Sequence, residues 1–237
     1  MQSKELIEKL ERLAPPEYAE SWDNPGLLVG SAKREVHKVY IALDADGEAV
    51  DRAVRCGCDM ILTHHPLLFS AVKSIRDEDF IGHRLMMMIE NRINYFAMHT
   101  NFDTAVMADL AADRLKLQNK QPLAMVRETE SGLKGIGSTG DLTEEMTLAE
   151  LAIFVRKAFN LPQVRCYGKP DTKIRRVSMC PGIRSRRPGL YYRRCGSSLW
   201  YRLCRKRNLC DRCGASWTGT YFCALYGAVD AGKLSGN

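Results

Sequence analysis

The sequence predicts an α/β fold, built on a mostly parallel sheet flanked by helices. Three short runs, at 39–43, 60–63 and 95–98, are apolar and rich in β-branched and aromatic residues, as buried strands are. Segments with apolar residues at helical spacing lie between them. Apolar strands that alternate with helices along a chain are typical of a parallel sheet that is covered on both faces.

The helices follow from the spacing of their apolar residues and from the residues at their ends. The first is expected over 3–13, where Ser3 is a candidate cap and Pro15-Pro16 ends the helix. Thr147 is expected to cap the last helix, and a strand follows at 174–179. The helices expected after the first are, in chain order, 48–56, 80–93, 105–117 and 147–159.

Length and composition allow a hydrophobic core and exclude several classes of protein. The chain has 237 residues, of which 45% are hydrophobic and 27% charged, which is ordinary for a globular protein and wrong for a disordered one. It lacks the run of roughly 18 apolar residues that a membrane span needs, and its N-terminus lacks the apolar segment of a secretory signal. We therefore expect a cytoplasmic protein whose nine cysteines are thiols or metal ligands.

Charge divides the chain into an ordinary body and an unusual tail. Residues 1–182 hold 24 Lys and Arg against 26 Asp and Glu, a net charge of −2. Residues 183–237 hold 11 basic residues, nine of them Arg, against two acidic ones, a net charge of +9, and five of the nine cysteines. We expect an α/β metal-site domain at 1–125, a further α/β segment at 126–182, and an Arg- and Cys-rich tail at 183–237 that is disordered.

Two groups of potential metal ligands come directly after predicted strands. His64 and His65 follow the second predicted strand, and Pro66 prevents an immediate helix. His99 and Asp103 follow the third. In open α/β sheets, ligands bind beyond the carboxyl ends of the strands, which is where both groups fall. Neutral imidazoles with a carboxylate suit Zn, Mn or Fe, so the sequence predicts a metal site here.

The five histidines do not carry equal weight. The position of His99 fits a metal ligand, a support for a ligand and a catalytic acid–base, and the sequence does not choose between them. His37 and His83 are isolated, so we expect them to be structural or exposed to solvent.

Four blocks of sequence carry a family resemblance. They are A-E-x-W-D-N-x-G-L-L-V-G at 19–30, T-H-H-P-L-L-F at 63–69, H-T-N-F-D at 99–103, and the segment 137–142. In this order and spacing, over roughly residues 3–182, the chain resembles the NIF-three-like dinuclear-metal proteins. Bacterial members of that family are commonly called GTP cyclohydrolase 1 type 2 homologues.

The resemblance implies a site, an assembly and an activity. It implies two metal ions, with His64, His65 and Asp103 matching three of the family's five ligand positions. It implies a homohexamer in which the metals face an inner cavity. It also implies a metal-dependent hydrolase, labelled for GTP ring opening, in which the metals activate water for attack on a C–N or phosphoester centre.

The chain departs from the family near its C-terminus. The family's other two ligands are a His and a Glu in a stretch like A-G-H-x-x-x-E, preceded by a T-G-D…H-H segment. Here no His follows His99 and no Glu follows Glu150. With three ligands we expect one weakly bound ion or none. We also expect the last family elements to be missing or scrambled, so that the body exposes apolar surface and the hexamer assembles poorly.

A reading-frame change is one hypothesis for the tail. A single-nucleotide slip near Gly182 would translate the family's C-terminus out of frame. Trp200 and Trp217 are encoded by TGG, so each gives Gly in the frame one base downstream, and Gly fits the family at both places. Excess Arg, few acidic residues and scattered Cys are what a wrong frame yields from an ordinary gene.

The alternative is that the tail has a function of its own. It contains one C-x-x-C pair, and its arginine and aromatic residues resemble those that bind RNA. A zinc module normally has two tight ligand pairs and the tail has one, which argues against a nucleic-acid partner. Three function classes therefore remain: a metal-dependent hydrolase with an incomplete site, a metal-binding or assembly protein without turnover, and a nucleic-acid binder that acts through the tail.

Overall fold

The structure is a computed structural model that describes residues 1–129, 132–164, 166, 168–180 and 199–200. The described part of the chain divides into two compact units, Met1–Phe102 and a second that begins at Asp103. Each has its own four-stranded sheet. The domain boundary expected near residue 125 falls within a strand of the second unit. The tail that was predicted to be disordered lies outside the described residues, apart from the short strand Leu199–Trp200.

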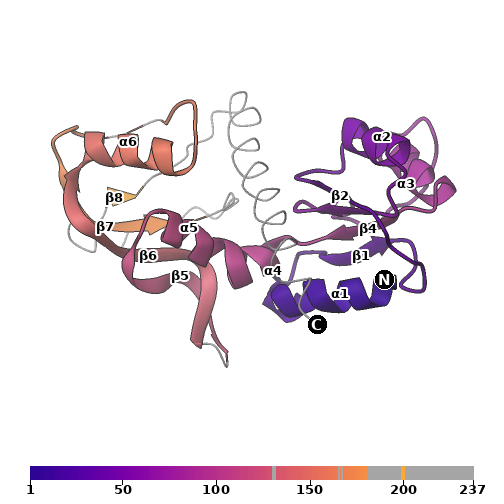
Figure 1. Ribbon diagram of the computed structural model, residues 1–237, viewed down its shortest axis with the longest axis horizontal. Helices are drawn as coiled ribbons and strands as arrows, with labels where there is room; N and C mark the ends of the chain where they lie inside the picture. Colours follow the sequence, from indigo (N-terminus) through magenta and orange to yellow (C-terminus); the bar gives the residue numbers. More distant parts are fainter. Residues whose placement is uncertain (130–131, 165, 167, 181–198, 201–237) are drawn as a thin grey trace. The chain divides into compact units, whose positions relative to one another are not determined.

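The sheet of the first unit has the strand order β1-β4-β3-β2 (Figure 1). Strands β2, β3 and β4 run parallel, and β1 is antiparallel to β4. The mostly parallel sheet is thus confirmed, with an antiparallel edge strand that the sequence did not predict. The bounds of its strands are β1 (Gly26–Val29), β2 (Val39–Ala42), β3 (Met60–Thr63) and β4 (Asn94–Ala97).

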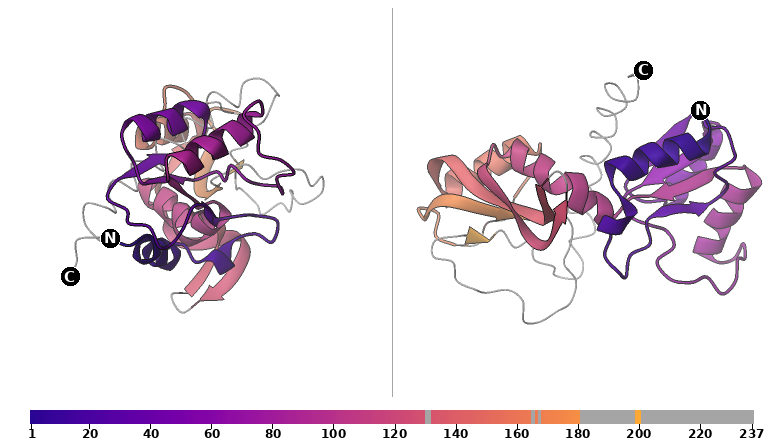
Figure 2. Two further views of the ribbon diagram at one scale, coloured as in Figure 1. Left: turned by 90° about the vertical axis from the view of Figure 1, so that its right-hand side faces the viewer. Right: turned by 90° about the horizontal axis from the view of Figure 1, so that it is seen from below.

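Helices cover both faces of this sheet. Helix α1 (Ser3–Leu13) lies on one face, while α2 (Gly47–Arg55) and α3 (Phe80–Glu90) pack together on the other (Figures 1 and 2). A short 3-10 helix, η1 (Pro16–Tyr18), follows α1. Apolar side chains of α2, α3, the strands and the residues between α3 and β4 form the core, including Val50, Ile61, Met88, Ile93 and Tyr95. The three helices and three strands predicted in this region are confirmed within a few residues at each end.

Ser3 does not cap α1, and that prediction was wrong. The N-cap is Gln2, whose side chain makes no capping hydrogen bond. Ser3 is buried, and its Oγ accepts a hydrogen bond of 2.9 Å from Nδ2 of Asn94 at the start of β4. A buried amide requires an acceptor, so the tertiary contact has replaced the local cap.

The sheet of the second unit is largely antiparallel. Its strand order is β5-β6-β7-β8, and only the pair β7–β8 is parallel. Two residues join β5 to β6, which is too short for the crossover that parallel strands need. The sequence predicted β7 but not the β5–β6 hairpin. The strands are β5 (Gln118–Thr129), β6 (Gly132–Thr147), β7 (Lys173–Met179) and β8 (Leu199–Trp200).

The helices of this region begin at the junction of the two units. A single turn, α4 (Thr100–Phe102), ends the first unit. The helix predicted over 105–117 begins as a π-helical segment, η2 (Asp103–Met107), and continues as α5 (Ala108–Arg114). The predicted cap of α6 (Leu148–Ala158) is confirmed, because Thr147 and Glu150 form a capping box.

None of the described helices has the length and apolar character to cross a bilayer. The cytoplasmic location stays a prediction.

Candidate metal centre

The candidate residues lie together beyond one edge of the first sheet, the edge formed by the carboxyl ends of its parallel strands. Strands β2, β3 and β4 are parallel, so the residues after them, Asp44, His64 and His99, lie beyond the same edge. Strand β1 runs the other way, so the segment before it, which contains Asp23, reaches this edge as well. Ligand sites in open α/β sheets occupy this position.

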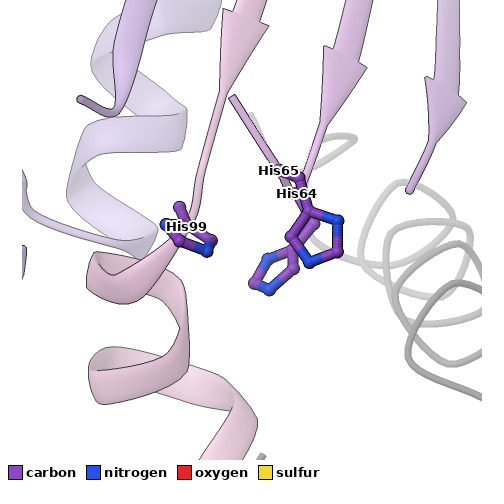
Figure 3. A group of neighbouring side chains, drawn as sticks. All are labelled: His64, His65 and His99. Carbon is purple, nitrogen blue, oxygen red and sulfur yellow. The ribbon is translucent and has the colours of Figure 1, made fainter. Parts of the chain in front are cut away.

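Three imidazole rings converge beyond that edge (Figure 3). His64, His65 and His99 each offer a potential ligand atom, and these atoms all lie within 4.8 Å of one another. The ring centroids are 4.9 Å apart for His64 and His65, 5.2 Å for His64 and His99, and 5.6 Å for His65 and His99. The structure therefore brings together the two histidines predicted as ligands and the third whose role the sequence left open.

Each of the three rings has an acceptor at Nδ1. An oxygen of a carbonyl or carboxylate accepts, so Nδ1 carries the proton and a neutral ring keeps its lone pair on Nε2. Such acceptors are the usual partners behind histidines that bind a metal. The hydrogen bonds join Nδ1 of His64 to the Met98 carbonyl (2.9 Å), Nδ1 of His65 to Asp44 Oδ1 (2.8 Å) and Nδ1 of His99 to Asp23 Oδ1 (2.8 Å).

Burial and hydrogen bonding determine the charge of His64 and of Asp23. Burial is the main cause that lowers the pKa of His64 well below its usual range, and His65 and His99 add to the effect. His64 is therefore neutral at pH 7, the form that binds a metal. Burial would raise the pKa of Asp23, but hydrogen bonds from His99 and Thr100 outweigh it and lower that pKa to about 2. Asp23 is therefore an ionised acceptor.

Asp23 is the anchor of His99. Its side chain is fully buried, and its Oδ2 also accepts hydrogen bonds from the backbone N (2.9 Å) and the Oγ1 of Thr100. Thr100 Oγ1 in turn accepts from the backbone N of Glu20 at 2.9 Å. These contacts join the segment before β1 to the turn after β4, so they fix the orientation of the His99 ring.

The turn that carries the other two histidines rests on Tyr95. Its buried hydroxyl accepts from the backbone N of Leu67 at 2.8 Å, donates to the carbonyl of His65 at 3.1 Å, and lies 2.8 Å from Thr63 Oγ1. Burial raises the pKa of Tyr95 to about 12, so the phenol is neutral. The backbone at His65 is therefore held from inside the core.

Sequence reasoning missed both carboxylates behind the rings. Asp44 follows a predicted strand directly, as His64 does, and that shared position was a signal for it. Asp23 had no such signal, because its place depends on the antiparallel course of β1. Asp103 is buried at the start of η2, and within the described residues the group of converging ligand atoms does not include it. Its role as a ligand stays a prediction.

The donor set fits a divalent metal ion. A tetrahedral zinc ion with Zn–N distances of about 2.0–2.1 Å places its ligand nitrogens about 3.3 Å apart. Nitrogens already within 4.8 Å of one another need only small side-chain rotations to reach that spacing. Three imidazole ligands also leave a fourth position for water or substrate, as in catalytic zinc sites.

Comparison with known proteins identifies the family. The chain matches the family Duf34/NIF3 (NGG1p interacting factor 3) over residues 1–186. It belongs to this family.

Curated relatives of this Duf34/NIF3 chain include longer proteins. A protein of Streptomyces coelicolor named GTP cyclohydrolase 1 type 2 homolog is 36% identical over 184 residues, which are 75% of this chain and 64% of that protein. The Duf34/NIF3 chain thus spans less than two thirds of that relative.

Solved structures share the fold. A Bacillus cereus protein related to NIF3 superposes with a TM-score of 0.69 at 24% identity, over 76% of each chain. A hypothetical protein of Staphylococcus aureus superposes with a TM-score of 0.67 at 28% identity, over 77% of this chain and 72% of its own. The described α/β architecture is therefore that of known Duf34/NIF3 structures.

Proposed function

We propose that this Duf34/NIF3 protein binds one divalent metal ion through Nε2 of His64, His65 and His99 and acts as a metal-dependent hydrolase. The observation that carries the proposal is the convergence of three rings, each with an acceptor at Nδ1. Histidines without a common function are not expected to converge on one position while each also has its own hydrogen-bond acceptor at Nδ1. A metal ion bound at that position explains the arrangement.

The chain's own residues prepare the site. Asp23, Asp44 and the Met98 carbonyl fix the tautomer of each ring and make Nε2 a better donor. Burial keeps His64 neutral. A bound ion supplies Lewis acidity for hydrolytic attack on a substrate. Asp103 stays the predicted carboxylate ligand, four residues after His99.

The names of relatives indicate which substrate to test first. The Streptomyces coelicolor relative is named a GTP cyclohydrolase 1 type 2 homolog, so GTP comes before simple phosphoesters. The family resemblance also implies a second ion and a homohexamer. Since the chain has no His after His99, we expect one ion. Since the family's last elements are expected to be missing or scrambled, we also expect impaired assembly. Light scattering that finds a well-folded hexamer would contradict the second expectation.

Zinc titration of the purified full-length chain tests the metal site. We expect one zinc ion per chain, identified by mass spectrometry of the metal, and at least a tenfold loss of affinity in each of His64→Ala, His65→Ala and His99→Ala. His83→Ala is the matched control, since His83 is half exposed and pairs with Asp77 outside the cluster. Equal zinc binding by all four variants would reject the site.

A turnover assay separates the hydrolase from a protein that only binds metal. GTP and p-nitrophenyl phosphate are incubated with the zinc-loaded chain, and products are compared with those of His64→Ala and Asp103→Ala. Hydrolysis that both variants lose supports the enzyme and the role of Asp103. Zinc binding without turnover of either substrate would favour the metal-binding alternative.

A further inference from the structure

Two exposed aromatic side chains border the metal centre. Trp22 is 57% exposed and Phe69 is 48% exposed. Their ring centroids lie 6.2 Å apart, and their planes differ by only 14°. Both rings meet His99 edge to face, at centroid distances of 6.0 Å for Trp22 and 5.5 Å for Phe69. Two nearly parallel aromatic rings therefore stand next to one of the three converging histidines.

Hydrogen bonds hold the segments that carry this pair. Asn24 Nδ2 donates to the carbonyl of Leu68 at 2.6 Å, which ties the segment after Trp22 to the residue before Phe69. Asp23, between Trp22 and Asn24, is fixed by His99 and Thr100 as described above. The segments that carry the two rings are therefore held in place before any ligand arrives, which lowers the entropic cost of binding one.

The two exposed aromatic rings favour a planar ligand. Large aromatic side chains left open to water gain free energy when another ring stacks on them. The shared orientation of the two rings suits a planar ring better than an aliphatic chain.

We propose that Trp22 and Phe69 bind the planar heteroaromatic ring of a ligand by stacking, beside the ion held at His99. This inference rests on the proposed metal centre and names the class of ligand that the centre receives. Stacking is tolerant of ring identity because every base has an aromatic face. The pair thus places a ring-bearing substrate within reach of the metal without selecting one base.

Calorimetric titration of the full-length, zinc-loaded chain tests the pair, with guanosine and adenosine as probes and D-ribose as the ring-free control. We expect both nucleosides to bind and ribose not to bind. Trp22→Ala and Phe69→Ala should each weaken guanosine binding roughly 5- to 100-fold. Trp22→Phe keeps an aromatic face and should remain within a few-fold of the original chain.

The matched control is Phe80→Ala. Phe80 is 66% exposed in the same unit and contacts Arg84, not a histidine of the cluster. It should bind guanosine like the original chain. Absence of nucleoside binding by a chain that binds zinc, or unchanged binding by Trp22→Ala and Phe69→Ala, would overturn the inference and leave the metal centre standing.

Two further readouts separate the remaining outcomes. The zinc affinity of each variant is measured in parallel, and repeating the titration without zinc shows whether stacking occurs alone. Guanosine binding that depends on Trp22 in a chain that never binds zinc would support stacking and reject the metal centre. If Trp22→Ala reduces the oligomer size by light scattering and leaves guanosine binding unchanged, the pair contacts a second copy and the inference is wrong.

Discussion

At the scale of single residues, the positions of hydrogen-bond acceptors decide what the histidines can do. The ring of His83 also has a carboxylate at Nδ1, Asp77, at 2.6 Å, but it lies on the surface and no second histidine joins it. The ring of His99 has Asp23 at the same atom, in a buried setting and facing two further rings. The chemical difference between the two histidines therefore lies in their neighbours.

Asp23→Asn is expected to weaken zinc binding about 10- to 100-fold, because the supporting carboxylate behind His99 loses its charge. The free energy of unfolding should fall by about 1–3 kcal/mol, since His99 and Thr100 lose a charged acceptor in a buried place. Zinc titration and urea denaturation measure the two effects. Asp77→Asn makes the same chemical change behind His83 and should alter neither quantity. Equal zinc affinity of both variants would contradict the role of Asp23.

Because the phenol of Tyr95 is buried, we expect the protein to lose stability at high pH. The pKa of its phenol is raised by burial from the ordinary value of 10.0 to about 12, so the folded state favours the neutral form. That contribution is complete below pH 10 and is lost as the pH rises toward 12, with about 1.4 kcal/mol gone by pH 11. Urea denaturation of the original chain and Tyr95→Phe at pH 9, 10 and 11 measures it. The difference between the two proteins should shrink with pH, and parallel curves would refute the assignment.

At the scale of elements, local signals and tertiary contacts compete at the helix ends. Thr147 caps α6 as its sequence predicted, because the capping box needs only residues three apart. Ser3 also has a hydroxyl at the start of α1, but Leu6 and not Glu lies three residues on, and the Oγ of Ser3 accepts a hydrogen bond from Asn94. The buried side chain of Asn94 also accepts a hydrogen bond from the backbone N of Ser31 and donates one to the Ser31 carbonyl. A buried amide needs hydrogen-bond partners, and this requirement determines the contact with Ser3.

Thr147→Ala should lower the free energy of unfolding by about 1 kcal/mol, because the backbone N of Glu150 loses its side-chain acceptor and Glu150 loses its partner hydroxyl. Chemical denaturation followed by circular dichroism measures this. Thr147→Ser keeps the cap and should restore most of the loss. Thr143→Ala, at an exposed position of β6, is expected to stay within about 0.5 kcal/mol. A Thr147→Ala midpoint equal to that of Thr143→Ala would show that the box adds nothing.

At the scale of the whole molecule, the family match ends at nearly the same residue at which the amino-acid composition changes. The match to Duf34/NIF3 covers residues 1–186, and the basic, Cys-rich composition begins at about residue 183. The three converging histidines all lie in the matched part. The three histidines proposed as ligands therefore all come before the tail in the sequence.

The gene sequence tests the origin of the tail. If a single-nucleotide slip near Gly182 produced it, translation one base downstream will give a T-G-D…H-H segment and an A-G-H-x-x-x-E stretch in place of residues 183–237. Restoring that frame should then raise zinc binding from one ion to two, because it supplies two more ligands. An early stop codon in the shifted frame, or absence of both segments, would disprove the hypothesis.

The sequence by itself determined the parallel strands and helices of the first unit, the cap of α6 and the placement of His64 and His65 at the edge of the sheet. These depend on periodicity and on residues a few positions apart, so the local chain carries the information. The tertiary structure decided the antiparallel course of β1, the β5–β6 hairpin and the membership of His99 in the cluster. The pairing of Asp23 with His99 joins residues 76 positions apart. A hydrogen bond of that span exists only once two distant segments are folded side by side, and no local pattern encodes it.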